Sequence, residues 1–160
     1  MNISTDKHMT DHEVKRALIA ACAAALREKM AFQKRAMDTA QAEANTHKGA
    51  MSSRYDTFKE EAQALRDGHA KQVQQLGDII ALVQQLDARP STKVCMGAVV
   101  QADGGNFFVS TGLVDEPITI DGVDYDCIGP TAPLLQQLRG LPNGQKGKNF
   151  GKEINVIRVF

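Results

Sequence analysis

Arg89-Pro90-Ser91-Thr92 divides the chain into two parts of different character. No proline precedes this tetrapeptide, whereas the five prolines and most of the 13 glycines lie within it or after it. Proline interrupts helices and glycine favours turns, so the first part is expected to be helical and the second rich in strands and turns. The pattern predicts an α+β protein: an N-terminal antiparallel two-helix coiled-coil hairpin over residues 1–89, then a small β-rich domain with one short helix over residues 90–160.

The first helix has a recognisable start at Thr10. Thr10 and Glu13 form a capping-box pattern, in which each side chain satisfies a backbone donor of the other residue, directly before the apolar residues Val14 and Leu18. The helix is expected to run from about residue 11 to about residue 44.

The second helix is expected over about residues 54–88, because apolar or neutral residues alternate in steps of four and three, as in a coiled-coil seam. The predicted seam residues are Phe58, Ala62, Leu65, His69, Gln72, Leu76, Ile79, Val83 and Leu86. His69 is interpreted as a partly exposed seam histidine rather than a ligand. Residues 45–53 contain turn-forming residues and a glycine, and are expected to form the exposed tip that reverses the chain.

Short apolar runs separated by turn residues follow Pro90. Asp103-Gly104-Gly105-Asn106 and Asp121-Gly122 are expected to be hairpin turns. A short helix is expected from about Ala132, with Gly140 at its end. The expected strands are 94–100, 107–110, 117–120, 123–128 and 154–160, and the basic segment before the last strand is expected to be a loop.

Composition limits the classes of function. Lys plus Arg and Asp plus Glu both total 19, so there is no basic excess to drive direct nucleic-acid binding. Cys22, Cys95 and Cys127 form no CxxC pair and are expected to be reduced, mostly buried thiols of a cytoplasmic protein. No apolar run approaches the length needed to span a bilayer. We expect a monomer with no metal site or cofactor of its own.

Four segments after Pro90 form a recognisable series: Lys93-Val94-x-x-Gly97, Ile128-Gly129-Pro130-Thr131-Ala132-Pro133-Leu134-Leu135-x-x-Leu138-x-Gly140, Gly144 and Phe150-Gly151-Lys152-Glu153. With the helical hairpin before them, they resemble the bacterial Gre transcript-cleavage factors, GreA and GreB. The resemblance covers about residues 12–160 and is most specific in the segment from Ala132 to Gly140. It implies an FKBP-like C-terminal domain that docks on the rim of the secondary channel of RNA polymerase, with the hairpin entering the channel.

The tip departs from the family pattern. Gre factors carry an aspartate and a glutamate that help to hold a magnesium ion of the polymerase, since hard cations prefer carboxylate oxygens. In this chain the corresponding positions are Ala50 and Ser53, and the nearest carboxylates are Glu43 and Asp56. The residues expected at the channel tip are His47, Lys48, Gly49, Ala50, Met51, Ser52, Ser53 and Asp56.

The resemblance also implies a docking site at the short helix, where Pro133 and an exposed Leu134 would contact the polymerase. We therefore predict a transcription regulator that binds RNA polymerase through its secondary channel, is not an enzyme and does not efficiently stimulate transcript cleavage. The alternatives are a working cleavage factor that uses Glu43 or Asp56, an FKBP-like isomerase or holdase, and a coiled-coil adaptor. Low aromatic content, 5%, argues against the aromatic-lined proline pocket of an isomerase.

Overall fold

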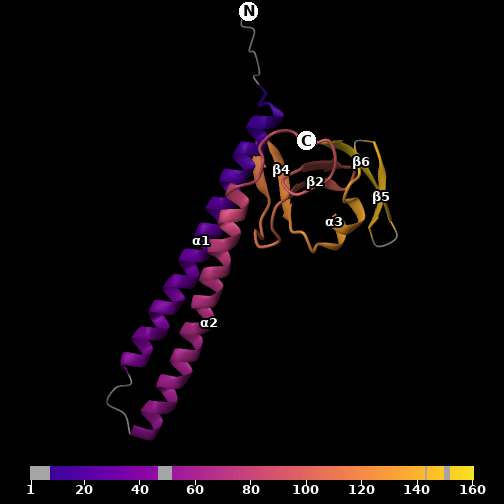
Figure 1. Cartoon of the computed structure of the whole chain (residues 1–160). Coiled ribbons are helices and arrows are strands. Elements are labelled where there is room, and N and C mark those ends of the chain that lie inside the picture. The colour runs from indigo at the N-terminus through magenta and orange to yellow at the C-terminus, as the bar shows by residue number, and fades with distance from the viewer. Residues whose placement is uncertain (1–7, 47–51, 143, 150–151) are drawn as a thin grey trace, which may run out of the picture. The chain divides into compact units, whose positions relative to one another are not determined.

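The computed structural model describes residues 8–46, 52–142, 144–149 and 152–160 (Figure 1). Within these residues two long helices are followed by a mixed sheet with one short helix, which confirms the predicted α+β class. The helices are α1 (Asp11–Thr46), α2 (Ser52–Gln84) and α3 (Pro133–Leu138). The strands are β1 (Val99–Ala102), β2 (Gly105–Val109), β3 (Ile118–Ile120), β4 (Val123–Ile128), β5 (Lys146–Asn149) and β6 (Lys152–Val159).

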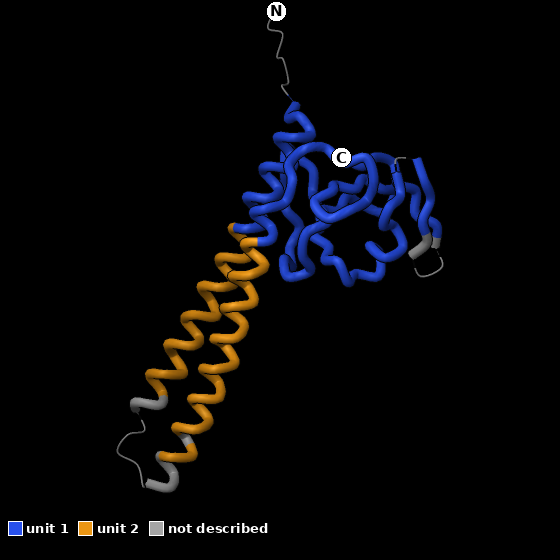
Figure 2. The backbone as a smooth tube through the Cα atoms, viewed as in Figure 1, with its two compact units in different colours: residues 1–23, 82–160 blue, residues 24–81 orange. Residues whose placement is uncertain are grey.

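The chain forms two compact units, which Figure 2 distinguishes by colour. Unit 1 contains residues 1–23 and 82–160, and unit 2 contains residues 24–81. The first turns of α1 therefore belong with the sheet, and the remainder of α1 belongs with α2. The expected domain boundary at residue 89 stays a prediction about independent folding.

The start of α1 confirms the capping-box prediction. The backbone N–H of Glu13 donates to Thr10 Oγ1 at 3.2 Å, and the backbone N–H of Thr10 donates to Glu13 Oε2 at 3.1 Å. These bonds satisfy donors that have no partner within the helix. A local pattern of two residues was therefore enough to locate this helix end.

The predicted end of α2 was four residues too late. The backbone N–H groups of Gln85 and Leu86 donate to carbonyls three residues back, at 3.2 Å each, which tightens the last turn. The backbone N–H of Arg89 then donates to the Asp87 carboxylate at 2.9 Å. This side-chain turn replaces the next helical bonds, and Pro90 disfavours helical backbone at the residue before it.

Within unit 2, α1 and α2 run side by side (Figure 1), and the seam on α2 is rotated from the predicted one. Leu65 is 51% exposed and Gln72 is exposed, whereas Val73 is half-buried and Ile80 is buried. The shared seam positions are Ala62, His69 and Leu76, so one of the two heptad positions was predicted correctly. The second row of the seam contains Val73 and Ile80 instead of the predicted row with Leu65 and Gln72. Packing between the helices, and not apolarity alone, selects which row is buried.

The strand order of the sheet is β3-β4-β2-β1-β6-β5, in which β2 and β4 are parallel and the other neighbours are antiparallel. The predicted strand 94–100 was too long at its start, because Gly97 has φ +85° and interrupts extended backbone. The turn between β3 and β4 confirms the Asp121-Gly122 prediction, since both residues have positive φ. The basic segment predicted as a loop contains β5, which pairs with β6.

Both faces of the sheet in unit 1 are covered. One face packs on α3 around Val100, Val109 and Leu135. On the opposite face Val99 and Phe108 are fully buried, as are Leu18 and Cys22 of α1. Alternation along β1 and β2 sends neighbouring side chains to opposite faces, so each strand serves two cores. Among the described helices, none combines the length and apolarity needed to cross a bilayer.

Candidate functional site

The tip residues predicted to enter the polymerase channel lie mostly outside the part that the structure describes. His47, Lys48, Gly49, Ala50 and Met51 are outside the described residues. Ser52 and Ser53 form the backbone start of α2, two residues earlier than predicted. Because α1 ends at Thr46 and α2 begins at Ser52, both helices extend into the segment predicted as the tip, residues 45–53.

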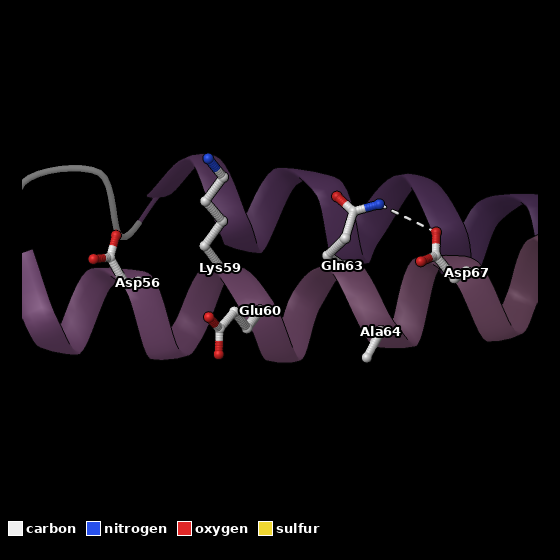
Figure 3. A pocket seen from close by; sticks show the side chains of 6 residues that line it. All are labelled: Asp56, Lys59, Glu60, Gln63, Ala64 and Asp67. Atoms are coloured by element: carbon white, nitrogen blue, oxygen red, sulfur yellow. Dashed lines mark hydrogen bonds between the residues drawn. The ribbon is translucent and has the colours of Figure 1, made fainter.

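Asp56, the last predicted tip residue, is exposed on the second turn of α2, and Glu43 is exposed near the end of α1. Asp56 also lines a shallow surface concavity along one face of α2 (Figure 3). The six lining residues recur at helical spacing and are Asp56, Lys59, Glu60, Gln63, Ala64 and Asp67.

This concavity has the character of a solvated helix face. Its carboxylates are spread over about three helical turns, and Gln63 Nε2 donates to Asp67 Oδ1 at 3.1 Å (Figure 3). Within the described ranges, no cluster of three or more His, Cys, Asp or Glu side chains is arranged to hold a metal ion. The concavity therefore contains no cluster of carboxylates arranged to hold a metal ion.

His69 lies at the interface between the two helices of unit 2. Its Nδ1 is 2.6 Å from Oε1 of Gln33 on α1, and the ring is half-buried. A carbonyl oxygen is an acceptor, so Nδ1 carries the hydrogen in this pair. This contact supports the interpretation of His69 as a seam residue that ties the helices together, rather than as a ligand.

The predicted docking residues lie at the start of α3, in unit 1. Pro133 is exposed and occupies the first turn, where its missing N–H costs no helical hydrogen bond. Leu134 is half-buried and packs against the core formed by Leu135, Leu138 and their neighbours. The expectation that Leu134 is an exposed anchor was therefore wrong, because the short helix needs this side chain to cover the sheet.

The turn that leads into α3 depends on a close backbone approach at Gly129. A Cβ atom on Gly129 would lie 2.8 Å from the backbone nitrogen of Gly112, a separation that real Cβ atoms essentially never show. The Gly129 carbonyl accepts from the N–H of Ala132 at 3.1 Å, which sets the chain direction before Pro133. Gly129 is part of the Gre-like segment, and its role here is to position the exposed start of α3.

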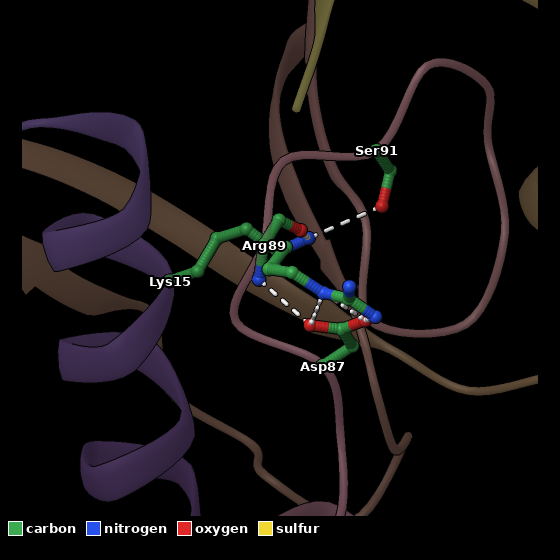
Figure 4. Close-up of polar contacts among 4 residues, drawn as sticks. All are labelled: Lys15, Asp87, Arg89 and Ser91. Carbon is green, nitrogen blue, oxygen red and sulfur yellow. Dashed lines mark hydrogen bonds and ion pairs between the residues drawn. The ribbon is translucent and has the colours of Figure 1, made fainter.

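Lys15 was not identified from the sequence as a structurally important residue. Its side chain is fully buried, and its Nζ donates to the Arg89 carbonyl at 2.8 Å and to Ser91 Oγ at 3.1 Å (Figure 4). Burial lowers the pKa of the Lys15 ammonium, and nearby acidic groups oppose that shift only partly. The available signal was its position in the row Lys15, Leu18, Cys22, at helical spacing on the buried face of α1.

Asp87 and Arg89 form an exposed ion pair beside this contact (Figure 4). Arg89 Nη2 lies 2.7 Å from Asp87 Oδ2, and Arg89 Nε also donates to the carboxylate. These hydrogen bonds lower the pKa of Asp87 to about 2. The stretch that divides the sequence is therefore held locally by Asp87 and anchored to α1 by Lys15.

Comparisons with known proteins give few matches. No family model matches the chain, and neither does any curated protein. The solved structures that are similar to this chain include "Crystal structure of GreA factor homolog 1 (Gfh1) protein of Thermus thermophilus" and "Structure of the transcription factor Gfh1". Each is 15% identical to this chain and has a TM-score of 0.35. The alignment covers 84% of this chain and 92% of the first structure or 90% of the second. At this level the comparisons do not establish membership of a family, and the Gre resemblance continues to depend on the sequence segments quoted above.

Proposed function

We propose that this protein is a cytoplasmic bacterial regulator of the Gre type that binds RNA polymerase through its secondary channel and does not efficiently stimulate transcript cleavage. In this proposal the protein acts on the polymerase and is not itself an enzyme. Any magnesium ion at the reaction centre belongs to the polymerase.

The observation that carries the proposal is the absence of carboxylates from residues 44–55, which include the end of α1, the start of α2 and the residues between them. Residues 24–46 of α1 form a helix about 35 Å long, at about 1.5 Å per residue, and α2 returns beside it. Such a helix pair has the dimensions to enter a channel. Without carboxylates, its end lacks the ligands that a second magnesium ion requires for phosphodiester hydrolysis.

The first test is binding to core RNA polymerase in a pull-down with purified components. Wild-type protein should be retained, and Pro133→Ala should weaken retention, because Pro133 is the exposed residue at the proposed docking helix. Pro117→Ala is a matched control, since Pro117 is an exposed proline of unit 1 away from α3. Absence of binding by the wild type would reject the proposal and leave the isomerase, holdase or adaptor alternatives.

The second test is transcript cleavage in a backtracked elongation complex. Wild-type protein should not accelerate cleavage, but it should reduce the cleavage stimulated by an authentic Gre factor, because both would occupy one channel. Ala50→Asp with Ser53→Glu should produce a gain of at least about tenfold, equivalent to about 1.4 kcal/mol of barrier. The control Gln74→Glu with Gln75→Glu adds the same charge at exposed positions of α2 remote from the tip.

The outcomes separate binding from chemistry. Strong cleavage by the wild type would contradict the non-catalytic proposal and favour the alternative in which Glu43 or Asp56 assists the polymerase. Equal gains from the tip variant and the control variant would show that added charge acts non-specifically. Binding and competition with no gain from the tip variant would retain the channel proposal and show that tip geometry differs along with charge.

A further inference from the structure

Cys22, Ser110 and Cys127 come together in unit 1 from three separate elements. Cys22 lies on α1 and is fully buried, Ser110 directly follows β2, and Cys127 is half-buried near the end of β4. The parallel pairing of β2 with β4 places Phe108 opposite Cys127, and the Ser110 N–H donates to the Ile128 carbonyl at 2.8 Å. Strand pairing therefore holds Ser110 and Cys127 next to each other.

Ser110 brings the two thiols to the same place. Cys22 Sγ lies 3.7 Å from Ser110 Oγ, and Cys127 is held beside Ser110 by the pairing of β4 with β2. Interaction with the Cys127 thiol lowers the pKa of Cys22 to about 7 although burial opposes that shift, and the same interaction together with burial raises the pKa of Cys127. Near neutral pH the Cys22 thiol therefore loses its proton more readily than an ordinary thiol does. The resulting thiolate is the nucleophilic form of cysteine.

We propose that Cys22 and Cys127 are a redox-active dithiol, which hydrogen peroxide converts into a disulfide between α1 and β4. Cys127 is partly exposed to solvent, which gives the oxidant access to the pair. The deprotonated sulfur attacks the peroxide oxygen and the O–O bond breaks, which forms a sulfenic acid and, after protonation, a water molecule. The second thiol then attacks the sulfenic sulfur, the S–S bond forms, and the hydroxyl leaves as water. Two electrons pass from the thiols to the peroxide, and the two thiol protons are carried away in the water.

Cys95 is an internal control for this pair. It is also half-buried, but it packs against the core on the α3 side of the sheet, with Val94 and Ala98 as sequence neighbours. A reaction that depended only on partial exposure would modify Cys95 as readily as Cys127. A reaction that depends on the proximity of two thiols leaves Cys95 reduced.

The disulfide would also change the stability of unit 1. It joins residues 105 positions apart in sequence, and cross-links that close long loops reduce the conformational freedom of the unfolded chain most strongly. We expect the melting temperature to rise by several degrees on oxidation and to return after reduction. Amide hydrogens of residues 11–23 should exchange more slowly in the oxidised protein, because this part of α1 would be tied to β4.

The experiment treats the reduced full-length protein with a small molar excess of hydrogen peroxide and follows it by intact mass and peptide mapping. The expected product has lost two hydrogens and contains a peptide pair linked through Cys22 and Cys127. Cys22→Ser and Cys127→Ser should each abolish that product, whereas Cys95→Ser should form it at the wild-type rate. Mapping the wild type gives a result even if a variant fails to fold. Addition of oxygen without a cross-link, a cross-link through Cys95, or no reaction at Cys22 and Cys127 would each overturn the proposal.

Discussion

Gly129→Ala is expected to destabilise unit 1 through a single steric contact. The added Cβ would lie 2.8 Å from the backbone nitrogen of Gly112, whereas ordinary contact begins at 3.4 Å. Relief requires a displacement of about 0.6 Å between two backbone segments, with no flexible side chain available to absorb it. The same displacement would lengthen the neighbouring Ser110 N–H to Ile128 carbonyl bond from 2.8 Å to about 3.4 Å, close to the limit of a hydrogen bond.

The expected loss of stability follows from these changes. Overpacking costs about 1–3 kcal/mol, and weakening one buried hydrogen bond adds up to about 1 kcal/mol. Alanine also restricts the unfolded chain more than glycine does, which stabilises the folded state by about 0.4–1 kcal/mol and offsets part of this loss. The net destabilisation is therefore about 1–3 kcal/mol, which corresponds to a fall in melting temperature of about 3–10 °C for a chain of this size.

Gly112→Ala is the matched control, because it makes the same chemical change on the other side of the same contact. Its Cβ would meet only the Gly129 nitrogen, at 3.9 Å, which is ordinary van der Waals contact. Urea unfolding followed by circular dichroism should give Gly112→Ala a free energy of unfolding within about 0.5 kcal/mol of the wild-type value. Equal midpoints for the two variants, or a Gly129→Ala variant as stable as the wild type, would refute the steric argument.

Three further predictions concern charge and packing in unit 1. Arg89→Gln should raise the Asp87 pKa from about 2 towards its ordinary value of 3.8, which an NMR titration of the carboxyl group measures. The stability that the lowered pKa gives the wild type is present above pH 3.8 and is lost as pH falls through the lowered pKa, so the variant should lack it and the two stabilities should converge at low pH. Burial lowers the folded-state pKa of Lys15 below 10.5, so between the folded-state and unfolded-state pKa values the unfolded chain binds more protons than the folded protein. As pH rises through that window, the wild type should therefore gain stability relative to Lys15→Met, measured as the difference between their urea midpoints. A difference that does not change with pH would contradict this. Leu134→Ala should lower stability by about 1–3 kcal/mol because it removes a partly buried side chain, whereas exposed Gln136→Ala should change it by less than about 0.5 kcal/mol, and equal unfolding midpoints would argue against the packing role of Leu134.

The candidate site could be predicted from the sequence only in part. Asp56 and Pro133 are exposed, as a role in partner contact requires, but Leu134 is largely committed to the core. An apolar residue on a short helix has the same local pattern whether it faces a partner or a sheet. The proximity of Cys22 and Cys127 had no sequence signal either, because it depends on elements 105 residues apart.

The sequence by itself determined the features that arise from neighbouring residues. Thr10 and Glu13 located the start of α1, Asp121-Gly122 located the β3–β4 turn, and the absence of proline before Pro90 indicated the long helices. Each of these depends on backbone conformation and hydrogen bonds within a few residues, so the chain needs no distant contact to specify them.

Tertiary structure decided which of several similar local patterns became buried or paired. Lys15 is buried because the Arg89 carbonyl and Ser91 hydroxyl lie where its ammonium group ends. The basic segment of β5 became a strand because β6 supplies its hydrogen-bond partners. Likewise, Ile80 is buried, whereas its apolar neighbour Ile79 is only half-buried. Burial and strand pairing require partners distant in sequence, and composition and periodicity do not identify those partners.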